Sequence, residues 1–136
     1  MVDPLWFTDD TAGRVPVLLV ADDDEDILTL VRLRLTRSGF DVVVARDGEE
    51  ALRLTREHRP DLAVLDWMMP KTSGIEVLRA IRAGSDTAEI PVVLLTARAS
   101  DGDVAEGMAA GADDYIKKPF SPQDLAARVT TILTGV

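Results

Sequence analysis

Acidic side chains directly follow two apolar runs of this sequence, in positions that indicate a cation site. Asp66 ends the run 62–66, while Asp22 and Asp23 follow the run 17–21. Carboxylate oxygens with no histidine or cysteine beside them favour Mg²⁺, or else Mn²⁺, over zinc. Three carboxylates in one crevice stay ionised near neutral pH only if a cation offsets their mutual repulsion. These residues therefore predict a divalent-cation site.

Two further polar residues come at the ends of later strand-like segments and would suit the oxygens of a phosphoryl group. Thr96 ends the run 90–96, and Lys118 directly follows the segment 114–117. A hydroxyl and an ammonium group are both donors for such oxygens. Polar residues at the ends of four separate segments are improbable in a sheet built only for packing. We therefore expect them to form one site.

The elements that must bring these residues together alternate regularly along the chain. Short apolar runs bounded by turn residues are typical of strands buried on both faces of a parallel sheet. Segments with apolar residues at helical spacing separate these runs, and a last one follows the fifth. Strict alternation predicts right-handed βαβ units with helices on both faces, and such sheets bind ligands at the carboxyl ends of their strands. The predicted strands are residues 17–21, 42–45, 62–66, 90–96 and 114–117.

Composition narrows the class of protein. With 136 residues, 46% of them hydrophobic, the chain suits one soluble globular domain. Its formal net charge of -9 argues against direct binding to nucleic acid or to anionic membranes. It has no cysteine, no secretory signal at its amino terminus and no apolar run near the roughly 20 residues that span a bilayer. We expect a cytoplasmic protein with an amino-terminal extension at 1–16 and one domain at 17–136.

Four motifs occur in an order that resembles the receiver domain of two-component response regulators, in the chemotaxis-regulator-like superfamily. The motifs are residues 21–27 (ADDDEDI), 66–70 (DWMMP), 96–97 (TA) and 115–120 (YIKKPF). Each is weak alone, but together they are specific, and the resemblance runs from about residue 17 to the end. It implies a flavodoxin-like α/β fold: a doubly wound, five-stranded parallel sheet with strand order 2-1-3-4-5 and five helices. It also implies a phosphorylation-controlled signalling switch.

The resemblance assigns a role to each matched residue of the phosphoryl site. Asp66 would accept a phosphoryl group from the phosphohistidine of a sensor histidine kinase. Thr96 and Lys118 would each bind a phosphoryl oxygen, and the Lys118–Pro119 peptide bond would be cis, as in family members. Such a domain takes part in its own phosphorylation and dephosphorylation. We therefore expect a phosphoacceptor and not an enzyme.

The same resemblance implies a set of metal ligands. Asp23 and Asp66 would bind Mg²⁺ directly, together with the main-chain carbonyl oxygen of Met68, and Asp22 would act through a coordinated water. Mn²⁺ is the alternative metal. Met68 and Arg98 also stand where family members tune the hydrolysis of the phosphoryl group, and their bulk predicts a long-lived phosphorylated form.

Tyr115 matches the switch aromatic of the family. A new phosphoryl charge would draw Thr96 inward, and Tyr115 would rotate into the space that it leaves. The surface formed by the fourth helix, fifth strand and fifth helix would then change and regulate a partner or output domain. A two-state bias of this kind is worth about a few kcal/mol. Trp67, beside the acceptor, is expected to be a half-exposed loop residue without a chemical role.

Two other functions fit parts of the pattern. A Mg²⁺-dependent phosphohydrolase on a similar sheet also forms an aspartyl phosphate. Such enzymes generally need a second acid two residues after the nucleophile, where this chain has Met68. A receiver-like module that binds without phosphorylation would not require every site residue to be present.

The charge pattern on the last part of the chain bears on self-association. Winged-helix regulators of the family pair through charged positions on the face of the fourth helix, fifth strand and fifth helix. Some of those positions match here and others do not, so we expect a monomer or a weak homodimer. The matching positions are Asp113, Asp114 and Arg128, and the departing ones are Val104, Ala109 and Gly135.

Overall fold

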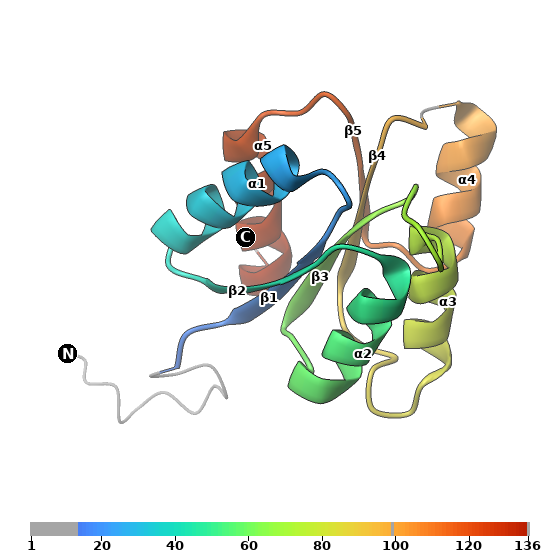
Figure 1. Ribbon diagram of the computed structural model, residues 1–136, viewed down its shortest axis with the longest axis horizontal. Helices are drawn as coiled ribbons and strands as arrows, with labels where there is room; N and C mark the ends of the chain where they lie inside the picture. Colours follow the sequence, from blue (N-terminus) through green and yellow to red (C-terminus); the bar gives the residue numbers. More distant parts are fainter. Residues whose placement is uncertain (1–13, 99, 136) are drawn as a thin grey trace.

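The computed structural model describes residues 14–98 and 100–135, which form a five-stranded parallel sheet and five helices (Figure 1). The strand order is β2-β1-β3-β4-β5, and every pair of neighbouring strands is parallel. The predicted doubly wound fold and its strand order are confirmed. Residues 1–13 of the predicted extension lie outside the described part of the chain. The strands are β1 (Val17–Ala21), β2 (Asp41–Ala45), β3 (Leu62–Asp66), β4 (Val92–Thr96) and β5 (Asp114–Lys117).

The helices cover both faces of the sheet, with α1 and α5 on one side and α2, α3 and α4 on the other (Figure 1). On the first side, Leu35 of α1 and Leu125 of α5 pack with Leu18 of the sheet. On the second side, Leu78 of α3 packs with Leu65. The sheet therefore separates two apolar layers. The helices are α1 (Glu25–Arg37), α2 (Gly48–His58), α3 (Gly74–Ala83), α4 (Asp101–Ala109) and α5 (Pro122–Thr134).

Polar capping residues determine where each helix begins. A side-chain oxygen before each helix accepts main-chain N–H groups of the first turn, which would otherwise lack partners. At the other end of α1, Gly39 takes a φ of 98°, a left-handed conformation that ends the helix. The caps are Asp24, Asp47, Ser73, Ser100 and Ser121.

Strand β4 begins at Val92, two residues later than the apolar run predicted. Pro91 has no N–H for the sheet ladder, although its carbonyl oxygen still accepts the N–H of Ala63 at 2.9 Å. Strand β2 begins at Asp41, one residue earlier than predicted. Both differences lie at the amino-terminal edge of the sheet, away from the candidate site.

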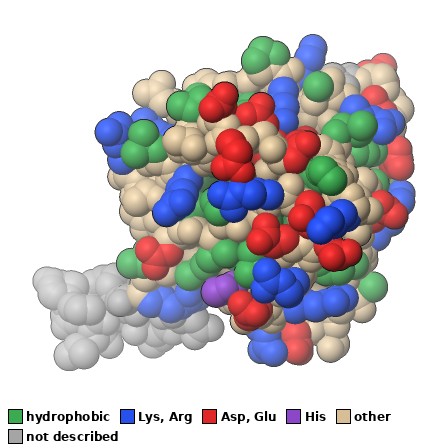
Figure 2. All heavy atoms as spheres, in the orientation of Figure 1, with side chains coloured by type: hydrophobic (Ala, Val, Ile, Leu, Met, Phe, Trp, Pro, Cys, Tyr) green, Lys and Arg blue, Asp and Glu red, His purple; other side chains and the backbone are tan. Residues whose placement is uncertain are grey.

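Acidic and basic side chains are interspersed over the face shown in Figure 2. A domain that binds nucleic acid concentrates lysine and arginine on one surface instead. This face therefore agrees with the expectation of no direct nucleic-acid binding, which stays a prediction. Within residues 14–98 and 100–135, no helix has the length and apolar character needed to cross a membrane.

Candidate functional site

The three acidic side chains predicted to share a site lie together at the carboxyl end of the sheet. Strands β1 and β3 are neighbours, so Asp22 and Asp23, just after β1, lie beside Asp66 at the end of β3. One carboxylate oxygen from each residue lies within 4.8 Å of the other two. Asp22 and Asp66 are buried, whereas Asp23 is exposed. The result is an acidic cluster whose outer member faces solvent.

Lys118 reaches this acidic cluster from the segment after β5. Its Nζ lies 2.9 Å from Asp22 Oδ2 and 3.4 Å from Asp66 Oδ2. Its main-chain N–H donates to the carbonyl oxygen of Thr96 at 2.8 Å, which fixes the segment against the end of β4. The peptide bond from Lys118 to Pro119 is cis, as predicted.

Ionisation of Asp66 costs free energy because its carboxyl group is buried beside the charge of Asp22. Burial and the charge of Asp22 raise the pKa of Asp66 to about 6, although the charge of Lys118 opposes this. Burial by itself would lower the pKa of Lys118. Its hydrogen bond to Asp22 and the two carboxylate charges outweigh burial and raise that pKa instead. At neutral pH the site therefore holds a charged lysine and a largely ionised Asp66.

The donor set of this cluster fits a hard divalent cation. Three carboxylates face one ammonium group, so the cluster is short of positive charge. Within the described residues, the buried Oδ2 of Asp22 has its ion pair with Lys118 Nζ and no other polar partner. Carboxylate oxygens that face so little positive charge suit Mg²⁺ or Mn²⁺. The carbonyl contribution of Met68 stays a prediction; the Met68 N–H lies 3.4 Å from Asp66 Oδ1 and donates to it.

We expect Asp66→Asn to stabilise the metal-free chain at neutral pH by about 1–3 kcal/mol. Because the pKa of Asp66 is raised to about 6 in the folded chain, the folded state holds this proton more tightly than the unfolded state does. The stability that comes from protonation is therefore lost as the pH rises through that value. Asparagine keeps the shape of the side chain and removes its charge. Urea unfolding of parent and variant with a chelator present measures the difference.

Two controls accompany this measurement. The difference in the free energy of unfolding between variant and parent should narrow as the pH falls below the Asp66 pKa of about 6. At such pH the parent also carries a neutral side chain at this position. Added Mg²⁺ should stabilise the parent more than the variant, which lacks one carboxylate. A variant no more stable than the parent at neutral pH would contradict the electrostatic cost assigned to Asp66.

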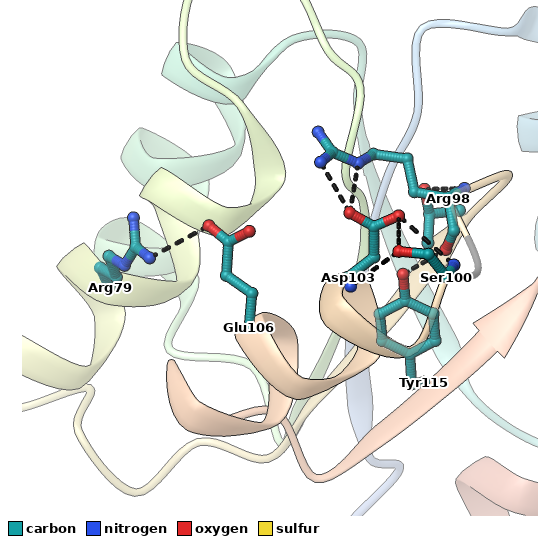
Figure 3. Close-up of polar contacts among 7 residues, drawn as sticks. Arg79, Arg98, Ser100, Asp103, Glu106 and Tyr115 are labelled. Carbon is teal, nitrogen blue, oxygen red and sulfur yellow. Dashed lines mark hydrogen bonds and ion pairs between the residues drawn. The ribbon is translucent and has the colours of Figure 1, made fainter.

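The two predicted switch residues, Thr96 and Tyr115, are joined through Arg98 in the loop after β4. Thr96 is fully buried at the end of β4, the strand next to that of Asp66. Its Oγ1 accepts the main-chain N–H of Arg98 at 3.0 Å. The Tyr115 hydroxyl donates to the carbonyl oxygen of Arg98 (Figure 3). The tyrosine is thus tied to the loop that follows the threonine, and the switching roles stay predictions.

The expectation that Trp67 is half-exposed is wrong, although Trp67 does lie in the loop directly after β3. Its side chain is only 3% exposed and packs in the same apolar layer as Leu65. The main-chain N–H of Trp67 still donates to the carbonyl oxygen of Leu95 at 3.2 Å. The two-residue alternation of side chains along β3 therefore continues through Trp67. The indole lies edge-on to Tyr115, with ring centroids 6.3 Å apart. It is also covered by the guanidinium of Arg98, 4.5 Å from the ring centroid.

Two glycines that sequence reasoning did not single out hold the loop after Asp66 in place. Gly74 opens α3, and its N–H donates to the carbonyl oxygen of Trp67 at 2.8 Å. A Cβ on Gly74 would overlap the carbonyl group of Asp66, and a Cβ on Gly48, which opens α2, would overlap that of Thr72. The available signal was a glycine at the first position of each helix, directly after its cap.

A family model described as the response regulator receiver domain matches residues 18–130 of this chain. The chain belongs to this receiver family. The family inferred from the four sequence motifs is therefore confirmed. Receiver domains are phosphorylation-controlled signalling proteins and not classical enzymes, and a phosphorylated aspartate and Mg²⁺ are general features of the family.

The curated relatives of this receiver domain are longer proteins. It is 48% identical over 116 residues to the alkaline phosphatase synthesis transcriptional regulatory protein PhoP of Bacillus subtilis. The aligned residues cover 85% of this chain and 48% of the PhoP protein. The chain thus spans about half the length of the curated relatives it matches.

This chain matches solved receiver structures over nearly the whole length of those structures. The receiver domain of the Francisella response regulator 1452 has 39% identity and a TM-score of 0.83, covering 88% of this chain and 98% of that one. The BeF3-activated DrrB receiver domain has 38% identity and a TM-score of 0.80, with the same coverage of 88% and 98%. The fold is therefore that of known receivers.

Charged residues on the predicted pairing face of this receiver domain have partners within the chain. Arg128 Nη1 lies 3.2 Å from Asp114 Oδ1, and Arg82 Nη2 lies 3.0 Å from Asp113 Oδ2. Arg82 also donates to the carbonyl oxygen of Gly111 at 2.7 Å. These charges are satisfied without a second copy, and the monomer or weak homodimer stays a prediction.

Proposed function

We propose that this receiver domain, at residues 17–136 after the extension 1–16, accepts a phosphoryl group on Asp66 from the phosphohistidine of a sensor histidine kinase. The observation that carries the proposal is the position of Lys118. Its Nζ lies 2.9 Å from Asp22 Oδ2 and 3.4 Å from Asp66 Oδ2. An ammonium group at that place can bind an oxygen of a phosphoryl group attached to Asp66.

Phosphoryl transfer asks the protein mainly for positioning and charge neutralisation. An oxygen of Asp66 forms a bond to phosphorus while the bond from phosphorus to the imidazole nitrogen of the kinase breaks, and that nitrogen keeps the electron pair. Lys118 supplies a fixed positive charge for one phosphoryl oxygen. The hydroxyl of Thr96 donates to another. Asp66 is largely ionised at neutral pH and so is available as the nucleophile.

The acidic cluster would hold the metal that this transfer needs. Asp23, Asp66 and the main-chain carbonyl oxygen of Met68 are the proposed direct ligands, and Asp22 would act through a coordinated water. Mg²⁺, or Mn²⁺ in its place, would neutralise charge on the phosphoryl oxygens when bound. The shortage of positive charge where three carboxylates face one ammonium group supports this assignment.

Phosphorylation would change the surface formed by α4, β5 and α5. The hydroxyl of Thr96 turns toward the phosphoryl group, and Tyr115 rotates into the space behind it. A partner or an output domain reads the altered surface. Longer relatives such as the PhoP protein are named as transcriptional regulatory proteins. Direct binding of nucleic acid or membrane by this segment is not proposed.

Intact mass after incubation with Mg²⁺ and acetyl phosphate tests the proposed chemistry. We expect one added phosphoryl group on the parent chain and none on Asp66→Ala. Asp41→Ala, which removes an exposed aspartate at the start of β2, serves as the matched control and should be labelled like the parent. Labelling of Asp66→Ala, or a parent that takes up no phosphoryl group, would disprove the assignment.

The same samples separate the switch from a phosphohydrolase. Steady turnover of p-nitrophenyl phosphate would favour the hydrolase, whereas stoichiometric labelling without such turnover favours the switch. Met68 stands at the place of the second acid that such a hydrolase needs, and its apolar side chain is 58% exposed. It offers no group for proton transfer.

A further inference from the structure

Four contacts meet at Arg98, in the loop between β4 and α4, and Figure 3 shows those with Asp103 and Tyr115. Its main-chain N–H donates to Thr96 Oγ1 at 3.0 Å, and its carbonyl oxygen accepts the Tyr115 hydroxyl. Its Nη2 lies 2.7 Å from Asp103 Oδ1, and its guanidinium lies 4.5 Å from the centroid of the Trp67 ring. One residue thus connects both switch side chains, the first turn of α4 and the residue next to the acceptor.

We propose that Arg98 is a positioning residue that latches the unphosphorylated conformation, with its guanidinium holding the start of α4 against Trp67. This latch rests on the function proposed above and extends it, because only Thr96 and Tyr115 were assigned to the switch there. It gives Trp67 a part in the switch as the fixed surface on which the latch closes.

The Trp67 end of the latch is rigid. The indole is buried, and the main-chain N–H of Trp67 donates to the carbonyl oxygen of Leu95 in the neighbouring strand. A flat guanidinium over the face of an indole gains a cation–π attraction that the compact ammonium of lysine matches less well. The edge of the same indole faces Tyr115 at an interplanar angle of 74°. Arg98 therefore bridges the acceptor strand and the switch aromatic.

The Asp103 end of the latch belongs to the first turn of α4. The N–H of Asp103 donates to Ser100 Oγ at 3.0 Å, and that hydroxyl donates to Asp103 Oδ2 at 2.8 Å. Asp103 thus uses one oxygen for the helix cap and the other for Arg98. One turn later, a Cβ on Gly107 would come within 3.1 Å of the Tyr115 ring. The positions of α4 and Tyr115 are therefore linked.

Phosphorylation works against this arrangement. When Thr96 turns its hydroxyl toward a phosphoryl group on Asp66, the N–H of Arg98 loses its acceptor. When Tyr115 rotates, the carbonyl oxygen of Arg98 loses its donor. Contacts made only in the unphosphorylated conformation favour that conformation, so removing the guanidinium shifts the balance toward the activated one. An exposed cation–π contact corresponds to about a two- to fivefold shift.

Titration with beryllofluoride, a phosphoryl mimic, measures the latch. All variants are made in the 136-residue chain with Trp6→Phe, so that Trp67 is the single indole, and its emission is followed at saturating Mg²⁺. Arg98→Met should lower the half-saturating concentration about two- to fivefold. Arg98→Lys keeps a charge for Asp103 and should give a smaller decrease. Arg79→Met is the control, because Arg79 makes a comparable exposed ion pair to α4, at 3.4 Å from Glu106 (Figure 3), whereas the guanidinium that covers Trp67 is that of Arg98.

The outcomes separate this latch from the function on which it rests. An unchanged or higher half-saturating concentration for Arg98→Met would overturn the latch, and so would an equal decrease for Arg79→Met. If the parent gives no response to beryllofluoride and takes up no phosphoryl group, the proposed function itself fails. A parent that is labelled on Asp66, together with an Arg98→Met chain that titrates like it, removes the latch alone.

Discussion

Lys118→Met is expected to accept phosphoryl groups about a hundredfold more slowly than the parent, while binding Mg²⁺ at least as tightly. Methionine keeps the unbranched shape of the side chain and lacks the ammonium group, which lies 2.9 Å from Asp22 and 3.4 Å from Asp66 in the parent. The transferred group then lacks one donor for its oxygens. The same ammonium group competes with Mg²⁺ for the carboxylates. Its removal should therefore raise the affinity of the acidic cluster for Mg²⁺.

Two measurements and one control check this expectation. Initial rates of labelling by acetyl phosphate come from intact mass, and Mg²⁺ affinity comes from Trp67 emission with Trp6 replaced by phenylalanine. Lys117→Met changes the exposed neighbouring lysine and should leave both values unchanged. Labelling of Lys118→Met at the parental rate would reduce Lys118 to a structural partner of the two aspartates. Weakened Mg²⁺ binding would contradict the competition between the two cations.

Gly74→Ala is expected to destabilise the chain by about 3 kcal/mol or more. The new methyl group would overlap the carbonyl group of Asp66 and the main chain of Trp67, neither of which can move aside as a flexible side chain would. Either α3 shifts away from the sheet or the end of β3 bends. Both responses also displace the acceptor carboxylate. The midpoint of urea unfolding reports the loss of stability, and Mg²⁺ binding reports the displacement.

Gly102→Ala is the matched control for this substitution. Gly102 also lies in the first turn of a helix, but among residues 14–98 and 100–135 a Cβ there would meet only Ser100 Oγ, at 3.9 Å. Alanine favours the helix by up to about 1 kcal/mol over glycine, so this variant should be slightly more stable than the parent. A Gly74→Ala chain as stable as Gly102→Ala would show that the loop after Asp66 is not held against α3.

The fold could be predicted because five apolar runs alternate with helical segments, and few topologies satisfy that order. The meeting of Asp22, Asp23 and Asp66 could be predicted for a related reason, since parallel strands end at one edge. The presence of Lys118 at this site could be predicted by the same rule, because it directly follows the fifth strand. The sequence did not show that Lys118 Nζ would contact Asp22 more closely than Asp66, because that depends on how the segment after β5 turns.

The surroundings of Trp67 were harder to predict. Its burial follows from the alternation of β3 continuing one residue past Asp66, which required knowing that its N–H still pairs with Leu95. Its stack with Arg98 joins residues that are distant in the chain, and no local pattern signals such a contact. The overlap that a side chain on Gly74 would cause is likewise visible only once the loop and α3 are placed.

The five-stranded sheet also acts as a partition between two compartments. Leu35 and Leu125 help to fill one, Leu78 and Trp67 help to fill the other, and within the described residues the two share no side chain. Because the two compartments share no side chain, we expect the stability effects of volume changes on opposite sides to add. Sequence drift beneath α1 and α5 can therefore proceed without repacking the side that carries Tyr115.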